Sequence, residues 1–214
     1  MPGSCDRALE TLRRLRAIRA RGLRVCVGFT LSSANADALP ATLAFLRAEL
    51  PALARGDLHL NVAHHSVHYY RNTPPRDLPL AARAALDAVA VARDAFGLVE
   101  WLFRRQLRHY LAAGRTTIAC RAIAASIFVG ADLTVHPCST WDHPLGNLRT
   151  TDLALSPLLA SARASRALAT IASRACPGCC TACDTLPSVL AQLPRALIAA
   201  GGRAHHRRLW EPAS

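Results

Sequence analysis

Apolar residues recur at helical spacing near the start of the chain and then give way to a continuous apolar run. Every third residue from Leu9 to Ile18 is apolar, which is enough for one buried stripe of a helix, and Gly22 can end that helix. Residues 23–31 (LRVCVGFTL) are apolar and rich in β-formers, as in a strand that is buried on both faces. The pattern therefore predicts a helix followed by an interior strand, with Cys26 as a small buried residue of that strand.

The alternation of helix and strand continues through a second unit. Ser33 and Asn35 can cap a second helix, in which leucines recur from Leu39 to Leu50. Residues 58–63 (LHLNVA) then indicate a second strand. Strands joined by a helical crossover pair in parallel, so this half predicts a parallel sheet or part of a (β/α) barrel.

The second half of the chain mixes helices with short β-like segments. A long helical stretch is expected over residues 80–113, with a break at Gly97. Residues 126–138 (SIFVGADLTVHPC) predict a hairpin. Two further helices are expected, one beginning at the N-cap Ser156 and one interrupted by Pro194.

Composition narrows the classes of protein that fit this pattern. The 214 residues, half of them apolar, suit one domain or one domain with a small appendage. All 26 basic residues are arginine and the net charge is +12, but the arginines are spread along helices with few aromatic residues, so nucleic-acid binding is not expected. Without an apolar run of about 18 residues or a signal-peptide pattern, we expect a cytoplasmic protein that does not enter the membrane. Eight cysteines in a compartment that keeps thiols reduced point to metal or redox chemistry.

Four of the eight cysteines lie in the segment CPGCCTAC, residues 176–183. A C-x2-C turn presents two sulfurs to one metal site, and Pro177 and Gly178 suit such a turn. Cys120 and Cys138 flank the predicted hairpin, with 17 residues between them, and supply two further sulfurs. Four thiolates can hold one [4Fe–4S] cluster or one tetrahedral zinc ion. Zinc sites often use two tight C-x2-C turns. This sequence has one such turn, and its other cysteine pair is separated by 17 residues, so the spacing favours the cluster.

This layout resembles the auxiliary-cluster region of radical S-adenosylmethionine (SAM) enzymes, the SPASM or twitch domain. The matching features are Cys120, the strand LTVHPC that ends at Cys138, the turn PLGNL at residues 144–148, and the CPGCCTAC run. The resemblance implies one auxiliary [4Fe–4S] cluster held by cysteines. The expected ligands are Cys120, Cys138, Cys176 and Cys179, with Cys183 as a fifth candidate and Cys180 as a bystander.

The upstream half is similar to the later β/α units of a radical SAM barrel, through TLSSAN at residues 30–35 and NVAHHSVHYYRN at residues 61–72. The resemblance implies an α/β fold, in which a partial (β/α) barrel lacking its first strands is followed by a small α+β SPASM/twitch-like domain. Barrel units with a linker helix are expected over residues 1–113, the iron–sulfur domain over 114–190, and a C-terminal helix with a basic tail over 191–214.

Two features depart from the family pattern. The family usually has glycine where this chain has Leu133, so the hairpin turn is expected to use residues 130–132. The alternative register C-x3-C-x2-C, which radical SAM enzymes use for their catalytic cluster, has Ala182 where an aromatic residue is usual, and only 31 residues follow Cys183. The catalytic cysteines and the first barrel strands are therefore expected before Met1, and the isolated chain is expected not to cleave SAM.

Polar residues that follow the two predicted strands are the other candidate site residues. By the family resemblance, Ser32 and Asn35 lie on the SAM side of the barrel, although both also suit helix capping. A substrate pocket is expected at the second strand and the polar loop after it, with a loop of no such role as the alternative. An H-x3-H pair in that loop could bind a metal if it is helical. The pocket candidates are Asn61, His64, His68 and Tyr69.

Three functions remain open from the sequence. The leading hypothesis is the iron–sulfur-binding part of a radical SAM/SPASM protein, in which the cluster transfers electrons or binds substrate during radical modification of a peptide or a small metabolite. The alternatives are a structural zinc module that binds a partner protein and a non-catalytic remnant. Under the leading hypothesis, the partners would be a chain that supplies the missing barrel strands and the peptide or small-molecule substrate.

Overall fold

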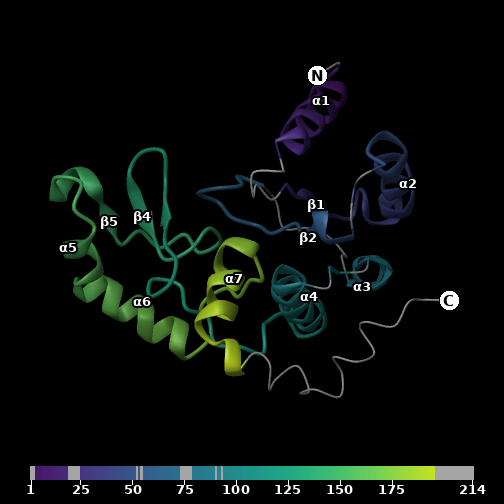
Figure 1. The fold of residues 1–214 in the computed structure, drawn as a ribbon. Helices are drawn as coiled ribbons and strands as arrows, with labels where there is room; N and C mark the ends of the chain where they lie inside the picture. The colour runs from purple at the N-terminus through teal and green to yellow at the C-terminus, as the bar shows by residue number, and fades with distance from the viewer. Residues whose placement is uncertain are drawn as a thin grey trace.

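The computed structural model describes residues 3–18, 25–51, 53, 55–72, 79–89, 91–92 and 94–195. A two-stranded parallel sheet with its helices forms one part, a small three-stranded antiparallel sheet with two helices forms the other, and α7 lies between them next to α4 (Figure 1). The main elements are α1 (Ser4–Ala17), β1 (Val27–Leu31), α2 (Leu39–Glu49), β2 (Leu58–Val62), α3 (Pro79–Ala88), α4 (Ala95–Ala113), β3 (Phe128–Val129), β4 (Thr134–His136), β5 (Gly146–Asn147), α5 (Ser156–Leu159), α6 (Ala162–Ala172) and α7 (Ala182–Ala191). Short 3₁₀ turns are η2 (Ala36–Ala38), η3 (Arg55–Asp57) and η4 (Leu148–Thr151).

Strands β1 and β2 pair in parallel, as the sequence predicts. Their register runs from Val27 opposite Leu58 to Leu31 opposite Val62. The prediction that the first strand is buried on both faces is wrong, because Gly28 and Thr30 are exposed. Within the described part of the chain no further strand joins this sheet, so the partial barrel stays a prediction. Cys26, expected to be buried, is exposed like Gly28 and Thr30, with which it alternates at every second position.

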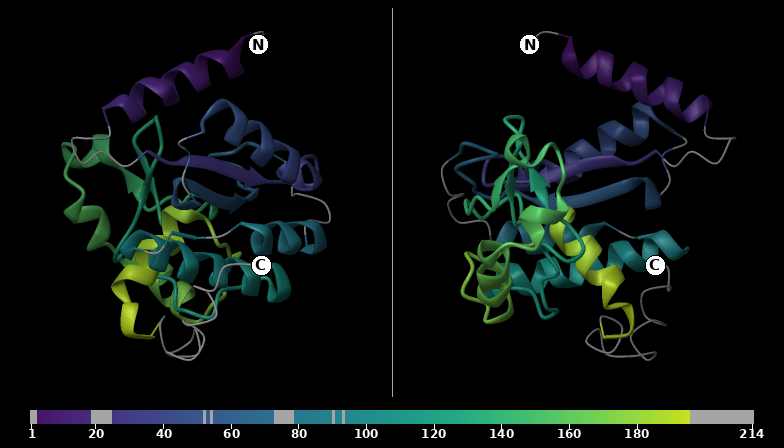
Figure 2. Two further views of the ribbon diagram at one scale, coloured as in Figure 1. Left: turned by 45° about the vertical axis from the view of Figure 1, so that its right-hand side comes forward. Right: turned by 90° about the vertical axis from the view of Figure 1, so that its left-hand side faces the viewer.

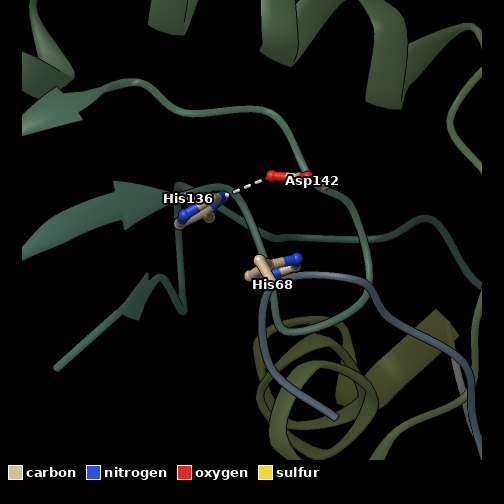
Figure 3. Close-up of side chains that lie close together, drawn as sticks. All are labelled: His68, His136 and Asp142. Atoms are coloured by element: carbon tan, nitrogen blue, oxygen red, sulfur yellow. Dashed lines mark ion pairs between the residues drawn. The ribbon is translucent and has the colours of Figure 1, made fainter. Parts of the chain in front are cut away.

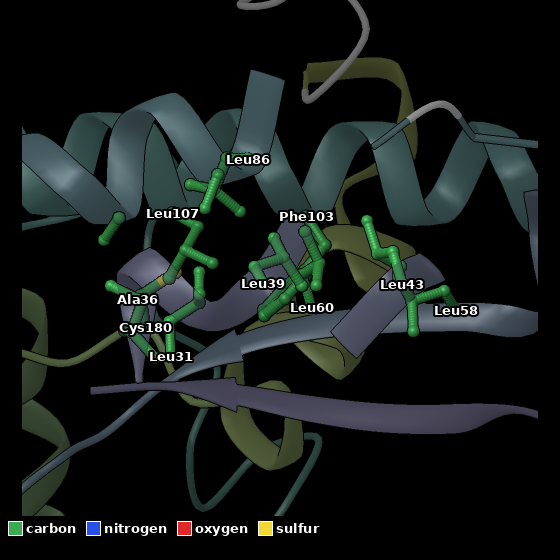
Figure 4. Packing of buried hydrophobic residues seen from close by; sticks show 13 residues of the cluster. Leu31, Ala36, Leu39, Leu43, Leu58, Leu60, Leu86, Phe103, Leu107 and Cys180 are labelled. Carbon is green, nitrogen blue, oxygen red and sulfur yellow. The ribbon is translucent and has the colours of Figure 1, made fainter. Parts of the chain in front are cut away.

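One cluster of buried side chains joins the parallel sheet to α2, α3 and α4 (Figure 4). Leu31 and Leu60 contribute from the strands, and Phe103 and Leu107 from α4; all four are completely buried. Cys180 from the cysteine run belongs to the same cluster, so the two parts of the molecule share a core. Helix α1 lies apart from this cluster and packs beside α2 through Leu9 (Figure 2).

The break in the long helical stretch lies before Gly97 rather than at it. Helix α4 starts at Ala95, and the carboxylate of its N-cap residue Asp94 accepts a hydrogen bond from the Gly97 N–H at 2.7 Å. A side chain at Gly97 would place its Cβ 1.8 Å from the carbonyl oxygen of Ala92. Gly97 is therefore needed for a close backbone approach inside the first turn, and the break itself is made by the Asp94 cap.

The helix expected from Ser156 is divided into α5 and α6. Ser156 is the first helical residue of α5, with Leu155 before it, so the prediction of Ser156 as the N-cap is wrong by one position. The hydroxyl of Ser161 instead accepts a hydrogen bond from the Ala164 N–H at 3.1 Å and caps α6. Ser161 lies five residues after Ser156, and it supplies the cap because it has the extended backbone geometry of an N-cap.

The predicted hairpin is confirmed, with β3 and β4 antiparallel and the turn over residues 130–132. Leu133, which stands where the resembled family has glycine, adopts φ +69°, a left-handed conformation that glycine favours. Its carbonyl still accepts a hydrogen bond from the Leu148 N–H at 3.0 Å, which joins the hairpin to η4. Leu133 therefore holds a backbone conformation at which glycine would be the less strained residue.

Replacing Leu133 by glycine is expected to stabilise the protein by about 1 kcal/mol, because the left-handed conformation costs a leucine about 1–2 kcal/mol and costs glycine little. Urea unfolding would measure the change. Leu190→Gly provides the matched control, because Leu190 is an exposed residue inside α7 and should lose about 1 kcal/mol. A loss of stability in Leu133→Gly as large as in Leu190→Gly would contradict the expected result.

No described helix is both long enough and apolar enough to cross a membrane. Helix α1 ends at Ala17, with Ile18 as its C-cap. The expected stop at Gly22 and the basic tail lie outside the described residues. Helix α7 contains Pro187 and ends at Ala191, before the interruption expected at Pro194.

Candidate metal centre

Four cysteines from three separate segments line one cavity of about 200 Å³. The cavity lies among the end of α6, the start of α7 and the segments that follow α4 and β4. These are the four cysteines that the sequence predicts as first-choice ligands, and the structure brings them together. They are Cys120, Cys138, Cys176 and Cys179.

The segment that carries Cys120 is held by two buried glutamines. The side-chain oxygen of Gln106 on α4 accepts hydrogen bonds from the N–H groups of Thr117 (2.8 Å) and Ile118 (3.3 Å). The side-chain amide of Gln192 donates to the carbonyl oxygen of Ala119 at 2.6 Å. This segment has no regular secondary structure, so these side chains replace the backbone ladder that would otherwise fix it.

The Cys176–Cys179 turn depends on Gly178. This residue has φ +75°, and a Cβ atom there would lie 3.0 Å from the carbonyl oxygen of Gly114, which caps the end of α4. A larger residue would be strained in conformation and crowded against backbone that cannot move easily. The turn therefore packs directly on the end of α4, which brings its two sulfurs next to the segment of Cys120.

Three of the thiols in the cavity have shifted pKa values. A hydrogen bond between the thiols of Cys138 and Cys179 lowers the pKa of Cys138 to about 7 and raises the pKa of Cys179 well above its ordinary value. Burial raises the pKa of Cys120 to about 11, although the Ala122 N–H donates to its sulfur at 3.4 Å. Since thiolates are the metal ligands, binding a metal at neutral pH must release protons from Cys120 and Cys179.

Asp184 links the cysteine-bearing segments, a role that sequence reasoning did not predict. Its carboxylate is buried and accepts hydrogen bonds from three hydroxyls. These come from Ser126 at 3.2 Å, Ser139 at 3.2 Å and Thr181 at 2.8 Å. Ser139 adjoins Cys138, Thr181 lies within the cysteine run, and Ser126 begins the hairpin segment. One side chain on α7 therefore fixes two of the three segments that carry the candidate ligands and the start of the hairpin.

Although the Cys138 and Cys179 thiols are hydrogen-bonded, no three of the cavity sulfurs lie as close together as one zinc ion requires. Zn–S bonds of about 2.3 Å in a tetrahedral site hold all four sulfurs within about 4 Å of one another. Among the described residues, a single group of three or more His, Cys, Asp or Glu has all its ligand atoms within 4.8 Å, and that group contains no cysteine. A [4Fe–4S] cube has wider spacing, because each sulfur binds a different iron at a separate corner.

The other two cysteines of the run point away from this cavity. Cys180 is completely buried in the core beneath the parallel sheet, and burial raises its pKa to about 12. Cys183, the fifth predicted ligand, lies exposed on the first turn of α7 and does not line the cavity. The structure thus separates the C-x2-C pair from both remaining cysteines.

Ser32 and Asn35, predicted on the SAM side, lie just past the C-terminal end of β1. The Asn35 side chain accepts a hydrogen bond from the Ser32 N–H at 2.7 Å and donates to the Thr30 carbonyl at 3.0 Å. Asn35 thereby shapes the turn that leads into η2, and it makes no side-chain cap bond to that turn. A contact with SAM stays a prediction for both residues.

The four substrate-pocket candidates do not line the cysteine cavity. Asn61 accepts a hydrogen bond from the neighbouring Val62 N–H at 2.9 Å, and Tyr69 is 51% exposed. His64 and His68 are not in a helix and reach different partners, the backbone of Cys180 and of Cys138 respectively. The H-x3-H pair therefore does not form one metal site, and a substrate role for these residues stays a prediction.

In comparisons with family models, curated proteins and solved structures, nothing matches this chain. The similarity to radical SAM auxiliary domains accordingly rests on the cysteine layout, the hairpin and the turn that follows it.

Proposed function

We propose that this chain binds one [4Fe–4S] cluster through Cys120, Cys138, Cys176 and Cys179. The observation that carries the proposal is the convergence of these four cysteines, from three segments of the chain, on one cavity. By its resemblance to SPASM and twitch domains, the chain would belong to a radical SAM system that modifies a peptide or a small metabolite. When bound, such a cluster supplies one-electron redox chemistry or a site that orients substrate.

The lining of the cavity suits an anionic cluster. Four thiolates outweigh the charge of the cube, and Arg115 and Arg174 at the cavity supply compensating positive charge. Asp184 is the one carboxylate among the lining residues, and its three hydroxyl donors offset its charge. The Ala122 N–H lies 3.4 Å from the Cys120 sulfur, and the Thr140 hydroxyl lies 3.4 Å from the Cys138 sulfur. Hydrogen bonds to ligand sulfurs are among the features that tune the reduction potential of a cluster.

Anaerobic reconstitution of the full chain with iron and sulfide tests the proposal. We expect about four iron and four sulfide ions per chain, a brown protein with thiolate-to-iron absorption, and an electron paramagnetic resonance signal after reduction. A colourless protein that retains one zinc ion would instead support the structural zinc module. A protein that binds neither would contradict both.

Single cysteine variants assign the ligands. Cys120→Ser and Cys176→Ser should each lose most of the reconstituted iron, because the cluster then lacks one thiolate. Cys183→Ser is the matched control from the same run, since its side chain lies outside the cavity, and it should retain the full iron content. Iron loss in Cys183→Ser equal to that in Cys176→Ser would overturn the ligand assignment.

A further inference from the structure

A second group of metal-ligand side chains lies outside the cysteine cavity. His68 belongs to the loop after β2, His136 ends β4, and Asp142 follows in the next loop (Figure 3). One ligand atom from each lies within 4.8 Å of the other two, the only such group of three in the part of the chain that the structure describes. The group therefore sits where the two parts of the molecule meet.

The hydrogen bonding of His68 fixes which of its nitrogens is free to bind. Its Nε2 atom lies 3.2 Å from the carbonyl oxygen of Cys138. A carbonyl oxygen only accepts, so Nε2 carries the proton, and Nδ1 carries the lone pair. That Nδ1 atom is buried and has no hydrogen-bond partner. A bond from one imidazole nitrogen to a backbone carbonyl is the arrangement that orients a metal-binding histidine.

His136 supplies the second free nitrogen. Its side chain is only 6% exposed, and its Nδ1 atom has no hydrogen-bond partner. The nearest carboxylate oxygen, on Asp142, lies 3.7 Å from that nitrogen, which is too far for a hydrogen bond. A buried nitrogen without a hydrogen-bond partner lowers the stability of the folded protein. A cation bound between the two Nδ1 atoms and the Asp142 carboxylate would give both nitrogens a partner.

The present ring positions need one adjustment to bind a metal. The rings of His68 and His136 stack at 4.2 Å with an angle of 14° between their planes, so their lone pairs lie in two nearly parallel planes rather than converging on one point. Within the described residues no hydrogen bond holds the His136 ring, so it can rotate about its Cβ–Cγ bond without losing one. Rotation would turn its Nδ1 atom toward the space shared with Asp142.

We propose that His68, His136 and Asp142 bind one divalent transition-metal ion, separate from the cluster site. Two imidazoles and one carboxylate suit zinc, cobalt and iron(II) rather than magnesium or calcium. Asp142 is 47% exposed, so the ion would be reached from solvent and would keep positions open for water. The proposal does not depend on the cluster, although Cys138 contributes its carbonyl oxygen beside this group and its thiol to the cysteine cavity.

Titration of the full-length chain with Co²⁺ tests this site directly, because absorption spectra separate the ligand types. Cobalt on cysteine gives thiolate charge-transfer bands, whereas cobalt on histidine and aspartate gives only weak visible bands. We expect a Co²⁺ ion with the second signature, whether or not the cysteines carry a cluster. His136→Ala should weaken its binding at least about 100-fold, more than the loss of an outer-shell partner.

Two further variants keep the result decisive if His136→Ala folds poorly. Asp142→Asn changes an exposed loop residue and should weaken Co²⁺ binding at least about tenfold. His65→Ala, in the same loop as His68 but outside the group of three, is the matched control and should bind as the unaltered chain does. Thiolate-type spectra alone, or unchanged binding in Asp142→Asn, would overturn the proposal.

Discussion

Replacing Glu100 by alanine is expected to destabilise the protein by about 3–5 kcal/mol, because it leaves a buried charge without its partner. The Glu100 carboxylate accepts a hydrogen bond from Arg104 Nε at 2.7 Å, and Arg104 is 2% exposed. Its second oxygen lies 2.7 Å from His59 Nδ1 on β2. The side chain thus joins α4 to the parallel sheet at the centre of the larger core.

Both members of this pair are charged in the folded protein. Burial alone would raise the pKa of Glu100, but the His59 hydrogen bond and the Arg104 charge together lower it. Burial lowers the pKa of Arg104, yet a guanidinium stays protonated in proteins. Removing the carboxylate therefore leaves a cation in the interior whose acceptors among the described residues are the backbone carbonyls of Leu58 and Val89.

Urea unfolding of Glu100→Ala beside Glu49→Ala measures the effect of burial. Glu49 also forms a 2.7 Å ion pair, with Arg13, but the two side chains are 40% and 46% exposed, so its loss should cost less than about 1 kcal/mol. Replacing both buried partners by apolar residues, as in Glu100→Leu with Arg104→Met, should recover much of the loss. Similar effects in Glu100→Ala and Glu49→Ala would contradict this account.

The turn and the hairpin that carry the cysteines could be predicted from the sequence because their signals are local, whereas the set of four ligands was implied by the family resemblance. Pro177 and Gly178 specify a turn, and alternating apolar residues specify the hairpin that ends at Cys138. By contrast, the role of Asp184 depends on Ser126, which is 58 residues away. Nothing in the local sequence around Asp184 distinguishes it from an acidic residue near a helix N-terminus, so only the fold reveals it.

The same limit explains the histidines. The sequence paired His64 with His68 because they are four residues apart, a spacing that requires a helix. The loop is not helical, and His68 instead meets His136, which is 68 positions further along the chain. Spacing can suggest a pair within one element, whereas pairs between elements follow from packing that periodicity does not encode.

The His64 side chain links the parallel sheet to the cysteine run, so replacing it should destabilise both parts of the structure. Its Nε2 atom accepts a hydrogen bond from the Cys180 N–H at 3.0 Å, so the proton lies on Nδ1, which donates to the Val62 carbonyl at 2.7 Å. His64→Phe keeps a ring that can stack on Tyr110 but leaves both backbone groups buried and unpaired. We expect a loss of about 2–4 kcal/mol in the free energy of unfolding.

The substitution should also affect the proposed cluster site, because Cys180 directly follows the proposed ligand Cys179. Reconstituted iron content should fall in His64→Phe, since the backbone beside the C-x2-C turn loses its anchor. His64→Gln, whose side-chain oxygen can still accept from the Cys180 N–H, should retain more of both properties. His65→Phe is the matched control from the adjacent position. Equal stability in His64→Phe and His65→Phe would rule out the anchoring role.

The pH dependence gives an independent check on the same hydrogen bond. Burial, the largest effect, lowers the pKa of His64 in the folded protein, so the unfolded chain takes up the proton first as the pH falls. The stability that neutral His64 contributes is therefore complete above its unfolded pKa of about 6.5 and is lost progressively below it. His64→Phe lacks this contribution, so the stability difference between it and the unaltered protein should shrink as the pH falls from about 7.5 to about 5.5. Other histidines, including His136, titrate in both proteins and cancel in the comparison; a difference that grows at low pH would show that His64 is not held in its neutral form.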